Sequence, residues 1–508
     1  MTLNQTFSHV LRQRALAHPH RDAVRDGELV VTYKQLDRAS DALARRIAAA
    51  GAKPGDRVIL MADNSAIHLA AAVAVWRTGA VLTTLYASSG PSEIAYALSH
   101  SEAVVAVVDA RANDLVRSVP EAPPTVTISN DDFAATDVPV TWERWDSPEA
   151  DPSDLALICY TSGSTAAPKA VMHSHTGLLA AAEAYAEVWH LGPEDRTVVC
   201  LPMAWAFGLV TTSMATLTAA GQIIVLQRTK PDLIIEALNR FGGTFLAGVT
   251  TMFVKLTERL EEIGNVDMPG LRLCISGGEP RNENVFARWT QATGCPVHDV
   301  YAASECFPAV TYDPYVDPIP VQGSSGKVAS GASMRVVDEN GRDVAPGTVG
   351  QALWKGPALF LGYWKDPEQT AKALTPDGWY RTGDLVKVNE SGYVFVEGRL
   401  SDIIIRGGSN VSPSEVEAVL ASHPSVRSAA VVGLPDELYG ELVAAALILR
   451  EGHTLDPEGL RTHCTAHLAG YKVPGLFVAL DALPINSRTG KVDRRQLKQD
   501  LQKKGVPA

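Results

Sequence analysis

The segment from Tyr160 to Lys169 has the residue types of a loop that binds phosphate. It follows an apolar run and is rich in small and hydroxyl side chains, reading Tyr160-Thr161-Ser162-Gly163-Ser164-Thr165-Ala166-Ala167-Pro168-Lys169. Small residues let backbone N–H groups approach phosphate oxygens closely, while hydroxyl groups and the Lys169 ammonium add further donors. The spacing differs from that of the G-x-x-x-x-G-K-[ST] loop. The segment therefore predicts a phosphate site of another type, and an ordinary polar turn after a strand is the alternative for the loop by itself.

This segment closely resembles the phosphate-binding signature of the adenylate-forming superfamily, which includes acyl- and aryl-CoA ligases, luciferases and the adenylation domains of peptide synthetases. Five later segments resemble further motifs of that family in the same order: Tyr301-Ala302-Ala303-Ser304-Glu305, Tyr380-Arg381-Thr382-Gly383-Asp384, Gly398-Arg399-Leu400-Ser401-Asp402, Gly407-Gly408-Ser409-Asn410-Val411-Ser412-Pro413-Ser414-Glu415 and Asn486-Ser487-Arg488-Thr489-Gly490-Lys491. Six ordered motifs over more than 300 residues are far more specific than one short loop. The resemblance implies that ATP and Mg²⁺ activate a carboxylic acid as an acyl-adenylate, whose acyl group then passes to coenzyme A.

The resemblance places the nucleotide among the phosphate loop and several later motifs. The carboxylate of Asp384 can accept hydrogen bonds from both ribose hydroxyls, and Arg399 would reach the same ribose and phosphate edge. The segment Gly277-Gly278-Glu279-Pro280 is similar to the one that backs the adenine and borders the acyl pocket. The implied ATP- or AMP-binding residues are Thr161, Ser162, Gly163, Ser164, Thr165, Lys169, Gly278, Glu279, Pro280, Asp299, Tyr301, Ala302, Asp384 and Arg399.

Three residues are expected to take part in catalysis. Attack of a carboxylate on the α-phosphorus of ATP brings two anions together, so the site needs cations and fixed donors. Glu305 is the expected Mg²⁺ ligand, because a hard cation prefers carboxylate oxygen, and Ser304 would hydrogen-bond a phosphate. Lys491 would place its ammonium between the two anions. The alternatives are a surface glutamate in a loop for Glu305 and a solvated charge near a basic tail for Lys491.

The catalytic lysine lies far along the chain from the phosphate loop, so two domains must close for chemistry. The resemblance implies a large domain of residues 1–398 that binds ATP and acid, a hinge at residues 399–402 and a small mobile domain of residues 403–508. Ser401 stands at the place of the hinge residue, which absorbs a change in φ and ψ. After adenylation the small domain would meet coenzyme A, and the residues expected along the CoA path are Gly407, Gly408, Tyr471 and Lys472.

The segment Leu201–Leu209 resembles the family's pocket-lining motif, with Trp205 at the place of an aromatic residue that often gates the acid channel. It contains no aspartate. An α-amino acid substrate would need a carboxylate there, because a buried ammonium requires a counter-charge. We therefore expect a hydrophobic acid of aryl, alicyclic or medium aliphatic type, with plain core packing as the alternative for each apolar residue. The expected pocket residues are Trp205, Ala206, Phe207, Val249, Ser276, Gly277, Ala303 and Phe307.

A few residues depart from the family pattern. Ala166, Ala170 and Ala302 replace usual glycines, and alanine would be strained wherever the backbone needs a positive φ. Since no charge or ligand is lost from the nucleotide site, we expect activity to be retained. His173 and His175 are expected in a turn and a helix cap rather than in a zinc site.

The elements that must position these residues follow from the apolar patterns. The first three-fifths of the chain alternates helices, such as Tyr33–Ala50, with apolar strands, such as Arg57–Met61 and Leu155–Tyr160. This alternation predicts parallel sheets covered on both faces. From about Val310, short strands between turns predict antiparallel or barrel-like structure. With the resemblance, the expected fold is α/β: a large N-terminal domain of two α/β subdomains plus a small β-barrel-like subdomain, then a small mobile α+β C-terminal domain.

Composition limits the function further. The chain has 508 residues and a net charge of −12, which argues against a nucleic-acid partner. The six cysteines form no C-x-x-C pair, and the most apolar stretch is too short to span a bilayer, so we expect a cytoplasmic monomer or homodimer. Two alternatives stay open: an enzyme that loads a carrier-protein phosphopantetheine, and a non-catalytic nucleotide-binding relative.

Overall fold

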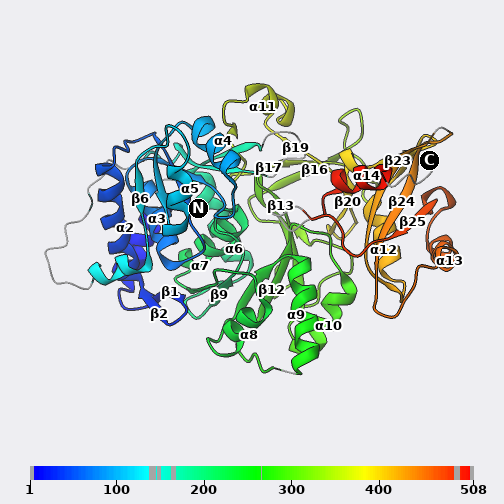
Figure 1. Ribbon diagram of the computed structural model, residues 1–508, viewed down its shortest axis with the longest axis horizontal. Coiled ribbons are helices and arrows are strands. Elements are labelled where there is room, and N and C mark those ends of the chain that lie inside the picture. Colours follow the sequence, from blue (N-terminus) through cyan, green and yellow to red (C-terminus); the bar gives the residue numbers. More distant parts are fainter. Residues whose placement is uncertain are drawn as a thin grey trace. The chain divides into compact units, whose positions relative to one another are not determined.

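The computed structural model describes residues 5–136, 145, 150–161, 168–264, 266–436, 438–485 and 492–503. The chain divides into two compact units, and Figure 1 labels many of their elements. The first comprises Met1–Gly278, Val285–Ser333 and Trp354–Tyr380, and the second comprises Glu279–Asn284, Met334–Leu353 and Arg381–Ala508.

A nine-stranded sheet forms one half of the first unit. Its core strands run parallel because helices return the chain between them: α9 (Thr250–Ile263) joins the neighbours β11 and β12, and α8 (Pro231–Asn239) joins β10 to β11 across β9. Strands such as β10 are short apolar runs that are buried along their whole length, as expected for parallel strands covered on both faces. The strand order is β15 (Lys327–Val328), β14 (Cys306–Thr311), β13 (Val297–Ala303), β12 (Leu273–Gly277), β11 (Phe245–Gly248), β9 (Arg196–Val199), β10 (Gln222–Val225), β1 (Asp22–Asp26) and β2 (Leu29–Thr32).

A seven-stranded sheet forms the other half. Strands β7, β4, β3, β5 and β6 are parallel, whereas β8 and β18 add an antiparallel edge. The order is β18 (Gly362–Tyr363), β8 (Ala170–Ser174), β7 (Leu155–Tyr160), β4 (Val81–Thr84), β3 (Arg57–Met61), β5 (Ala103–Val108) and β6 (Thr125–Thr127). The two sheets correspond to the two predicted α/β subdomains, and β3 and β7 have the predicted bounds.

Helices such as α2, α3 and α6 pack through buried apolar side chains, whereas α11 has no buried residue. In α2 the predicted stripe of Leu36, Ala39, Leu43 and Ile47 is buried, and Thr32 caps the helix in a reciprocal pair with Gln35. Besides α8 and α9, the described helices of this unit are α1 (Phe7–Ala17), α2 (Tyr33–Ala49), α3 (Ala66–Arg77), α4 (Pro91–Ser101), α5 (Ala110–Arg117), the 3₁₀ helix η1 (Asn130–Thr136), α6 (His175–Val188), the π-helix η2 (Phe207–Met214), α7 (Ala215–Thr218) and α11 (Pro367–Ala373), while α10 (Glu283–Thr293) begins in the second unit.

The region predicted to be barrel-like is an open antiparallel sheet. Its order is β16 (Ser333–Val337), β17 (Gly350–Lys355), β19 (Tyr380–Val388) and β20 (Val394–Arg399). The strand prediction is confirmed, but the described residues form no closed barrel, because the end strands β16 and β20 do not pair with each other.

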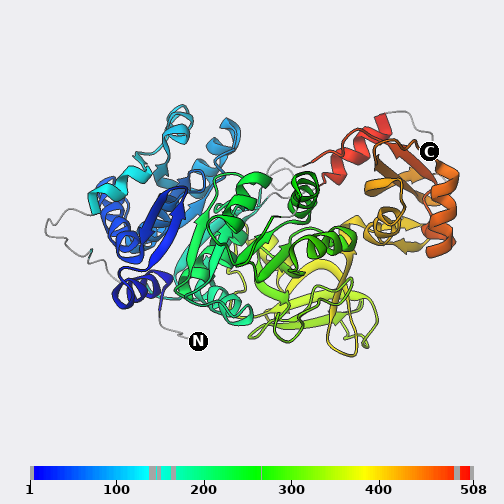
Figure 2. The same cartoon turned by 90° about the horizontal axis from the view of Figure 1, so that it is seen from below.

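The C-terminal part of the second unit has a separate sheet with a core on each face. Side chains of β23 and β24 alternate between a cluster with α12 and α13 and a cluster with α14. Figure 2 shows α13 and α14 on opposite faces of this sheet. The elements are η3 (Leu400–Asp402), β21 (Ile404–Arg406), β22 (Ser409–Val411), α12 (Pro413–Ala421), β23 (Val426–Asp436), β24 (Gly440–Leu449), α13 (Pro457–His467), η4 (Gly470–Lys472), β25 (Leu476–Ala479) and α14 (Arg494–Lys503).

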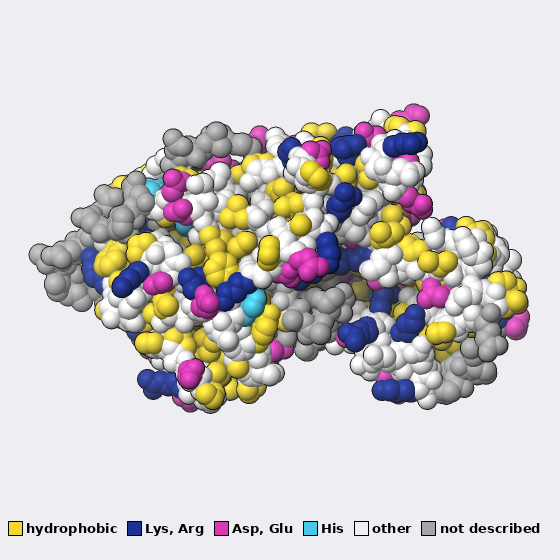
Figure 3. Space-filling view, turned by 90° about the horizontal axis from the view of Figure 1, so that it is seen from above, with side chains coloured by type: hydrophobic (Ala, Val, Ile, Leu, Met, Phe, Trp, Pro, Cys, Tyr) yellow, Lys and Arg dark blue, Asp and Glu magenta, His cyan; other side chains and the backbone are white. Residues whose placement is uncertain are grey.

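The surface carries mixed charge. On the face in Figure 3, Lys and Arg side chains are interspersed with Asp and Glu side chains rather than gathered into one patch. Among the described helices, none combines the length and apolar character needed to cross a bilayer.

Candidate active site

The phosphate-loop segment connects two antiparallel strands. Strands β7 and β8 pair up to Tyr160 and Ala170, and the backbone N–H of Thr161 donates to the Lys169 carbonyl across 2.8 Å. This bond closes the base of the loop. The predicted phosphate ligands Ser162, Gly163, Ser164 and Thr165, and also Ala166, lie outside the described residues. Ala170 lies in β8 without a positive φ, so the strain considered for it does not arise.

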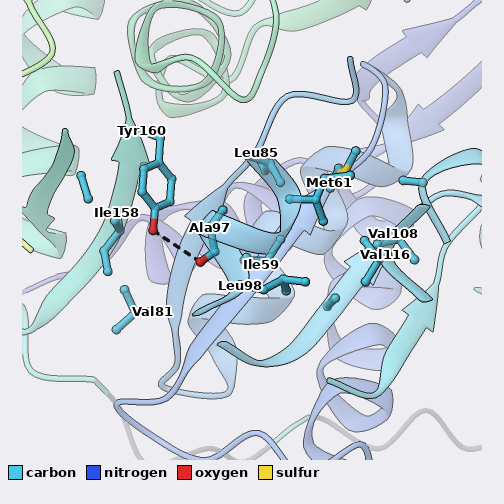
Figure 4. Close-up of a cluster of buried hydrophobic side chains, with 14 residues drawn as sticks. Ile59, Met61, Val81, Leu85, Ala97, Leu98, Val108, Val116, Ile158 and Tyr160 are labelled. Carbon is cyan, nitrogen blue, oxygen red and sulfur yellow. Dashed lines mark hydrogen bonds between the residues drawn. The ribbon is translucent and has the colours of Figure 1, made fainter. Parts of the chain in front are cut away.

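The end of β7 is anchored in a buried apolar cluster. Ile158 and Tyr160 of β7 pack with side chains of α4 and α5, and the Tyr160 hydroxyl donates to the Ala97 carbonyl across 3.4 Å (Figure 4). The same hydroxyl lies 3.1 Å from Nδ1 of His100. Burial of this apolar surface fixes the strand, and hence where the loop starts.

Glu305 lies in the tight turn of a hairpin. Ser304 and Glu305 connect β13 to β14, with Ala303 paired to Cys306. Glu305 is 8% exposed, and its Oε1 accepts a hydrogen bond of 2.8 Å from the Tyr363 hydroxyl. A second bond, from the Phe360 N–H to the Glu305 carbonyl, holds the backbone of the turn. The carboxylate is therefore both buried and fixed.

Tyr363 also faces the end of the phosphate-loop segment. It pairs with Val171 between β18 and β8, and the Lys169 ammonium lies 5.0 Å from the centre of its ring. Burial and the neighbouring Glu305 charge raise the pKa of Tyr363, so the phenol keeps its proton. The protonated hydroxyl donates a hydrogen bond to the Glu305 carboxylate. One neutral side chain thus contacts a candidate metal ligand and a candidate phosphate ligand.

His173 supports the same turn from the other side. The prediction that it lies in a turn is wrong: it is a buried residue of β8, whose strand character comes from pairing with β7. Its Nε2 lies 2.7 Å from the Ser304 carbonyl, which only accepts, so Nε2 carries the proton. Burial lowers the pKa of His173 to about 4, which keeps the ring neutral. The cap of α6 is Ser174, whose hydroxyl accepts from the Gly177 N–H, while His175 is the first helical residue.

The donor set around Glu305 fits a magnesium ion held mainly by phosphate. Mg²⁺ usually takes one or two protein carboxylates and completes its shell with phosphate oxygens and water. A single fixed carboxylate beside the base of a phosphate loop meets that requirement. Among the described residues there is no group of three or more His, Cys, Asp or Glu side chains placed to hold a metal.

Other predicted nucleotide residues of the first unit lie near strand ends. Asp299 of β13 is buried, and its Oδ2 accepts a 2.6 Å bond from the Ser325 hydroxyl. Tyr301 follows on the same strand, with its ring 5.8 Å from that of Trp354, and Ala302 comes next. Gly278 has a φ of 79°, where a side chain would be strained. Glu279 and Pro280 follow it and belong to the second unit.

Asp384 and Arg399 are joined in the second unit. They face each other across β19 and β20, and Arg399 Nε lies 3.1 Å from Asp384 Oδ1. The Asp384 N–H donates to the Thr382 hydroxyl, which donates to the Ala352 carbonyl. The structure therefore brings together the two residues predicted at the ribose.

The predicted acid-pocket residues follow neighbouring parallel strands of the nine-stranded sheet. Strands β9, β11, β12 and β13 are adjacent and parallel, so their carboxyl ends meet at one edge. Trp205, Ala206 and Phe207 follow β9, Val249 follows β11, Ser276 and Gly277 end β12, and Ala303 ends β13.

Close contacts hold that edge together. The Ser276 and Thr250 hydroxyls are 3.2 Å apart, and the rings of Trp205 and Phe207 are 5.4 Å apart. A Cβ at Gly277 would lie 2.5 Å from Cγ1 of Val300, 2.9 Å from the Val300 carbonyl oxygen and 3.2 Å from the Phe207 ring, so only glycine fits there without displacement. Phe307 is separate from this group among the contacts described, with its ring against that of His173 at 4.8 Å.

The predicted CoA-path residues occupy two turns of the C-terminal sheet region. Gly407 and Gly408 form the two-residue loop between β21 and β22, with φ values of 56° and 78°. Such a loop favours glycine for its backbone alone. Tyr471 is largely exposed in η4, whereas the Lys472 ammonium lies 2.7 Å from both oxygens of Glu415. Any contact of Lys472 with CoA must compete with this ion pair.

The predicted hinge and the segment next to the predicted catalytic lysine are linked by an arginine. Ser401 is exposed in η3, and its hydroxyl donates to Asp402. Arg494, at the start of α14, binds both oxygens of Glu417 at 2.5 and 2.9 Å and lies 3.6 Å from Asp402. Lys491 itself lies outside the described residues.

Sequence reasoning missed three residues that position the site. Tyr363 and His173 hold the Glu305 turn, and Asn64 binds the Leu201 carbonyl and the Met203 N–H at 2.8 Å each, ahead of the pocket segment. Only His173 was visible as an unusual residue near a motif. Tyr363 is 58 residues from its partner Glu305 in the sequence, and Asn64 is 137 residues from its nearer partner, Leu201. No local sequence pattern therefore reveals either contact.

Comparison with known proteins provides a further kind of evidence. The family model described as AMP-binding enzyme matches residues 11–364, and the one described as AMP-binding enzyme C-terminal domain matches residues 415–491. A feruloyl-CoA synthase from Amycolatopsis sp is 30% identical over 491 residues, which covers 96% of this chain and 97% of that protein.

Two further similarities extend over nearly the whole chain. A long-chain-fatty-acid–CoA ligase from Yersinia pestis is 31% identical over 518 residues, covering 94% of this chain and 91% of that protein. The crystal structure of ATP-bound MatB from Rhodopseudomonas palustris is 29% identical with a TM-score of 0.89, covering 98% of this chain and 99% of that one.

Proposed function

The chain belongs to the family of AMP-binding enzymes, and on that premise we propose that it is a carboxylic acid–CoA ligase. The enzyme uses ATP and Mg²⁺ to convert a hydrophobic carboxylic acid to its acyl-adenylate and then transfers the acyl group to coenzyme A. The observation that carries this proposal is that Lys169 and Glu305 both contact Tyr363, which links the end of the predicted phosphate-loop segment to the turn of the second motif. A loop donor and a fixed carboxylate at one place suit a metal-bound triphosphate.

The first half-reaction joins two anions. An oxygen of the acid attacks the α-phosphorus, the new bond to phosphorus forms, and the bond to the bridging oxygen breaks as pyrophosphate leaves. Lys169 and Lys491 oppose the charge on the phosphates and the acid, and Glu305 holds Mg²⁺. When bound, Mg²⁺ supplies positive charge that offsets the charge on the phosphate oxygens. Asp384 and Arg399 hold the ribose.

In the second half-reaction the thiol sulfur of CoA attacks the acyl carbon. The carbon–sulfur bond forms, the bond to the AMP oxygen breaks, and the thiol proton passes to solvent. We propose that Gly407 and Gly408 lie along the CoA path with Tyr471, and that residues 399–402 join domains 1–398 and 403–508. The exposure of Ser401 in a single 3₁₀ turn supports a hinge there, because few packed contacts oppose a change in φ and ψ.

The acid is hydrophobic in this proposal. Most of the predicted pocket residues at the ends of β9, β11 and β12 are apolar, and Ser276, Thr250 and Thr251 add hydroxyls there. The names of the two relatives, a feruloyl-CoA synthase and a long-chain-fatty-acid–CoA ligase, cover aryl and aliphatic acids. The six cysteines are free and buried, which supports a reducing compartment such as the cytoplasm. The proposed assembly is a monomer or homodimer.

Product analysis tests this function. Purified protein, ATP, Mg²⁺, CoA and each acid of an aryl, alicyclic and aliphatic panel should yield acyl-CoA and AMP in equal amounts. Formation of AMP without acyl-CoA, followed by thioester formation on an added phosphopantetheine carrier protein, would assign the carrier-loading alternative. Binding of ATP without AMP formation from any acid would assign the non-catalytic alternative.

Lys491→Ala separates the two half-reactions. Because the lysine acts on the approach of two anions, adenylate formation should fall at least about a hundredfold, while thioester formation from supplied acyl-adenylate should persist. Lys498→Ala is the matched control, since Lys498 is a nearby basic residue bound to Glu441 at 3.2 Å and should affect neither step. Equal loss of both steps in Lys491→Ala would contradict this division of labour.

A further inference from the structure

Tyr363 lies between two opposite charges that do not pair with each other. Its hydroxyl binds the Glu305 carboxylate at 2.8 Å, and the Lys169 ammonium lies 5.0 Å from the centre of its ring. Among the described residues, neither Glu305 nor Lys169 forms an ion pair. The Tyr363 side chain therefore contacts the Glu305 carboxylate with its hydroxyl and the Lys169 ammonium with the face of its ring.

The position of this ring is fixed by its backbone. Tyr363 is 4% exposed, its strand pairs with β8, and its N–H donates to the Thr370 hydroxyl across 2.9 Å. The next residue, Trp364, donates its backbone N–H to the Ala170 carbonyl and its indole N–H to the His100 carbonyl. The ring consequently has little freedom to follow either charge.

The neutral phenol of Tyr363 takes the place that an ion pair between Lys169 and Glu305 could occupy. A direct ion pair between Lys169 and Glu305 would offset both charges and would have to break before phosphate or metal could bind. A phenol donates a hydrogen bond without adding a charge of its own. With Tyr363 between them, neither the ammonium nor the carboxylate is offset by the other, and both can interact with an incoming ligand.

We propose that Tyr363 is a positioning residue that keeps Glu305 oriented toward a metal ion and Lys169 available for phosphate, by separating the two side chains. The inference rests on the proposed function, because it takes the ligand to be a magnesium-bound triphosphate. The hydroxyl of Tyr363 strengthens metal-dependent binding through Glu305, whereas its ring keeps Lys169 apart from Glu305.

The test compares the ligands AMP, ATP without Mg²⁺ and ATP with Mg²⁺ by calorimetric titration of the whole chain. Tyr363→Phe removes only the hydroxyl, and Glu305 then loses a hydrogen bond to a charged group, which is worth about a tenfold change in affinity. We expect about tenfold weaker binding of ATP with Mg²⁺, a higher Mg²⁺ concentration at half-saturation, and unchanged binding of AMP. Tyr363→Leu also removes the ring, so Lys169 can reach Glu305 and the loss should be larger.

Tyr33→Phe is the matched control. Tyr33 is also a fully buried tyrosine whose hydroxyl donates to a carbonyl, that of Gly221, across 2.7 Å, several strands away from β13. It should lower the melting temperature without changing any of the three affinities. Equal weakening of AMP and of ATP with Mg²⁺ by Tyr363→Phe, or a lower melting temperature with unchanged affinities, would show a merely structural role and overturn the proposal.

The outcomes also separate this inference from the proposed function. If the unaltered chain shows no Mg²⁺-dependent binding of ATP, the proposed function fails and the inference with it. If the unaltered chain binds ATP with Mg²⁺ and Tyr363→Phe binds it equally well, only the inference fails. If Phe and Leu weaken binding equally, the part assigned to the ring is wrong.

Discussion

Glu305 in the first unit and Asp384 in the second are both buried carboxylates, yet partners of different charge hold them. Glu305 is 8% exposed and accepts from the neutral phenol of Tyr363. Asp384 is 4% exposed and pairs with the Arg399 guanidinium at 3.1 Å, although the arginine side chain itself is 63% exposed. The two carboxylates differ in the charge left for a ligand rather than in burial.

This difference indicates what each carboxylate can bind. Glu305 is hydrogen-bonded to a neutral phenol, and no cationic side chain among the described residues pairs with it, so its carboxylate suits a divalent cation. The charge of Asp384 is partly offset by Arg399, so Asp384 suits uncharged hydroxyls that donate hydrogen bonds, while the exposed arginine can turn toward a phosphate. The proposed metal site and the proposed ribose site thus differ in their supporting residues.

Glu305→Gln should produce the largest effect. It keeps the shape and an acceptor for the Tyr363 hydroxyl but removes the charge, and a metal ion contributes several kcal/mol to a phosphoryl transition state. We expect kcat/KM for ATP in adenylate formation to fall on the order of a thousandfold, with AMP affinity unchanged by calorimetry. If Glu305→Gln weakens AMP as much as ATP with Mg²⁺, the two carboxylates do not differ as described.

Acid should lower the free energy of unfolding through His173, whose ring bonds the Ser304 carbonyl next to Glu305. Burial lowers the folded-state pKa of His173 from 6.5 to about 4, so between these values the unfolded chain holds more protons than the folded chain. The free energy of unfolding therefore falls as the pH falls from 6.5 to 4, by up to about 3 kcal/mol for this one group. Urea unfolding measured at steps across this range checks the slope.

His173→Gln provides the control for that slope. Glutamine offers an N–H to the Ser304 carbonyl but does not titrate, so the variant should lose part of the pH dependence. The rest should remain, because burial also lowers the pKa values of His68 and His175 to about 4. A variant with the same slope as the unaltered chain would contradict the assignment to His173.

Asp384→Asn should give the smallest effect and a different pattern. AMP and ATP share the ribose, and loss of one charged acceptor costs about a tenfold change in affinity. We expect calorimetry to show both nucleotides weakened alike, with or without Mg²⁺. A loss confined to ATP with Mg²⁺ would place Asp384 at the metal instead and reverse the comparison.

The parts of the fold that could be predicted are those whose sequence pattern is local. Strands β3 and β7 are continuous apolar runs, and the buried stripe of α2 repeats at helical spacing. Strand β8 was missed because it contains His173 and becomes a strand by pairing with β7, and β18 has only two residues. The barrel-like expectation failed because strand spacing does not reveal whether end strands pair.

The same distinction applies to the site. Glu305, Asp384 and Arg399 stand in motifs and could be named from the sequence, and the structure joins Asp384 to Arg399. Tyr363 and Asn64 could not be named, because their partners are fixed by how two sheets pack rather than by neighbouring residues. The hydrogen bonds that neutral side chains such as Tyr363 and Asn64 make to site residues therefore correspond to no recognisable sequence motif.

The central claim is that this chain joins a carboxylic acid to the α-phosphorus of ATP, and exchange of labelled pyrophosphate into ATP tests it most directly. With Mg²⁺ and without CoA, the account predicts exchange that appears only when a suitable acid of the aryl, alicyclic or aliphatic panel is added and that Lys491→Ala lowers at least about a hundredfold. Absence of exchange with every acid, or exchange at the same rate without acid, would contradict it.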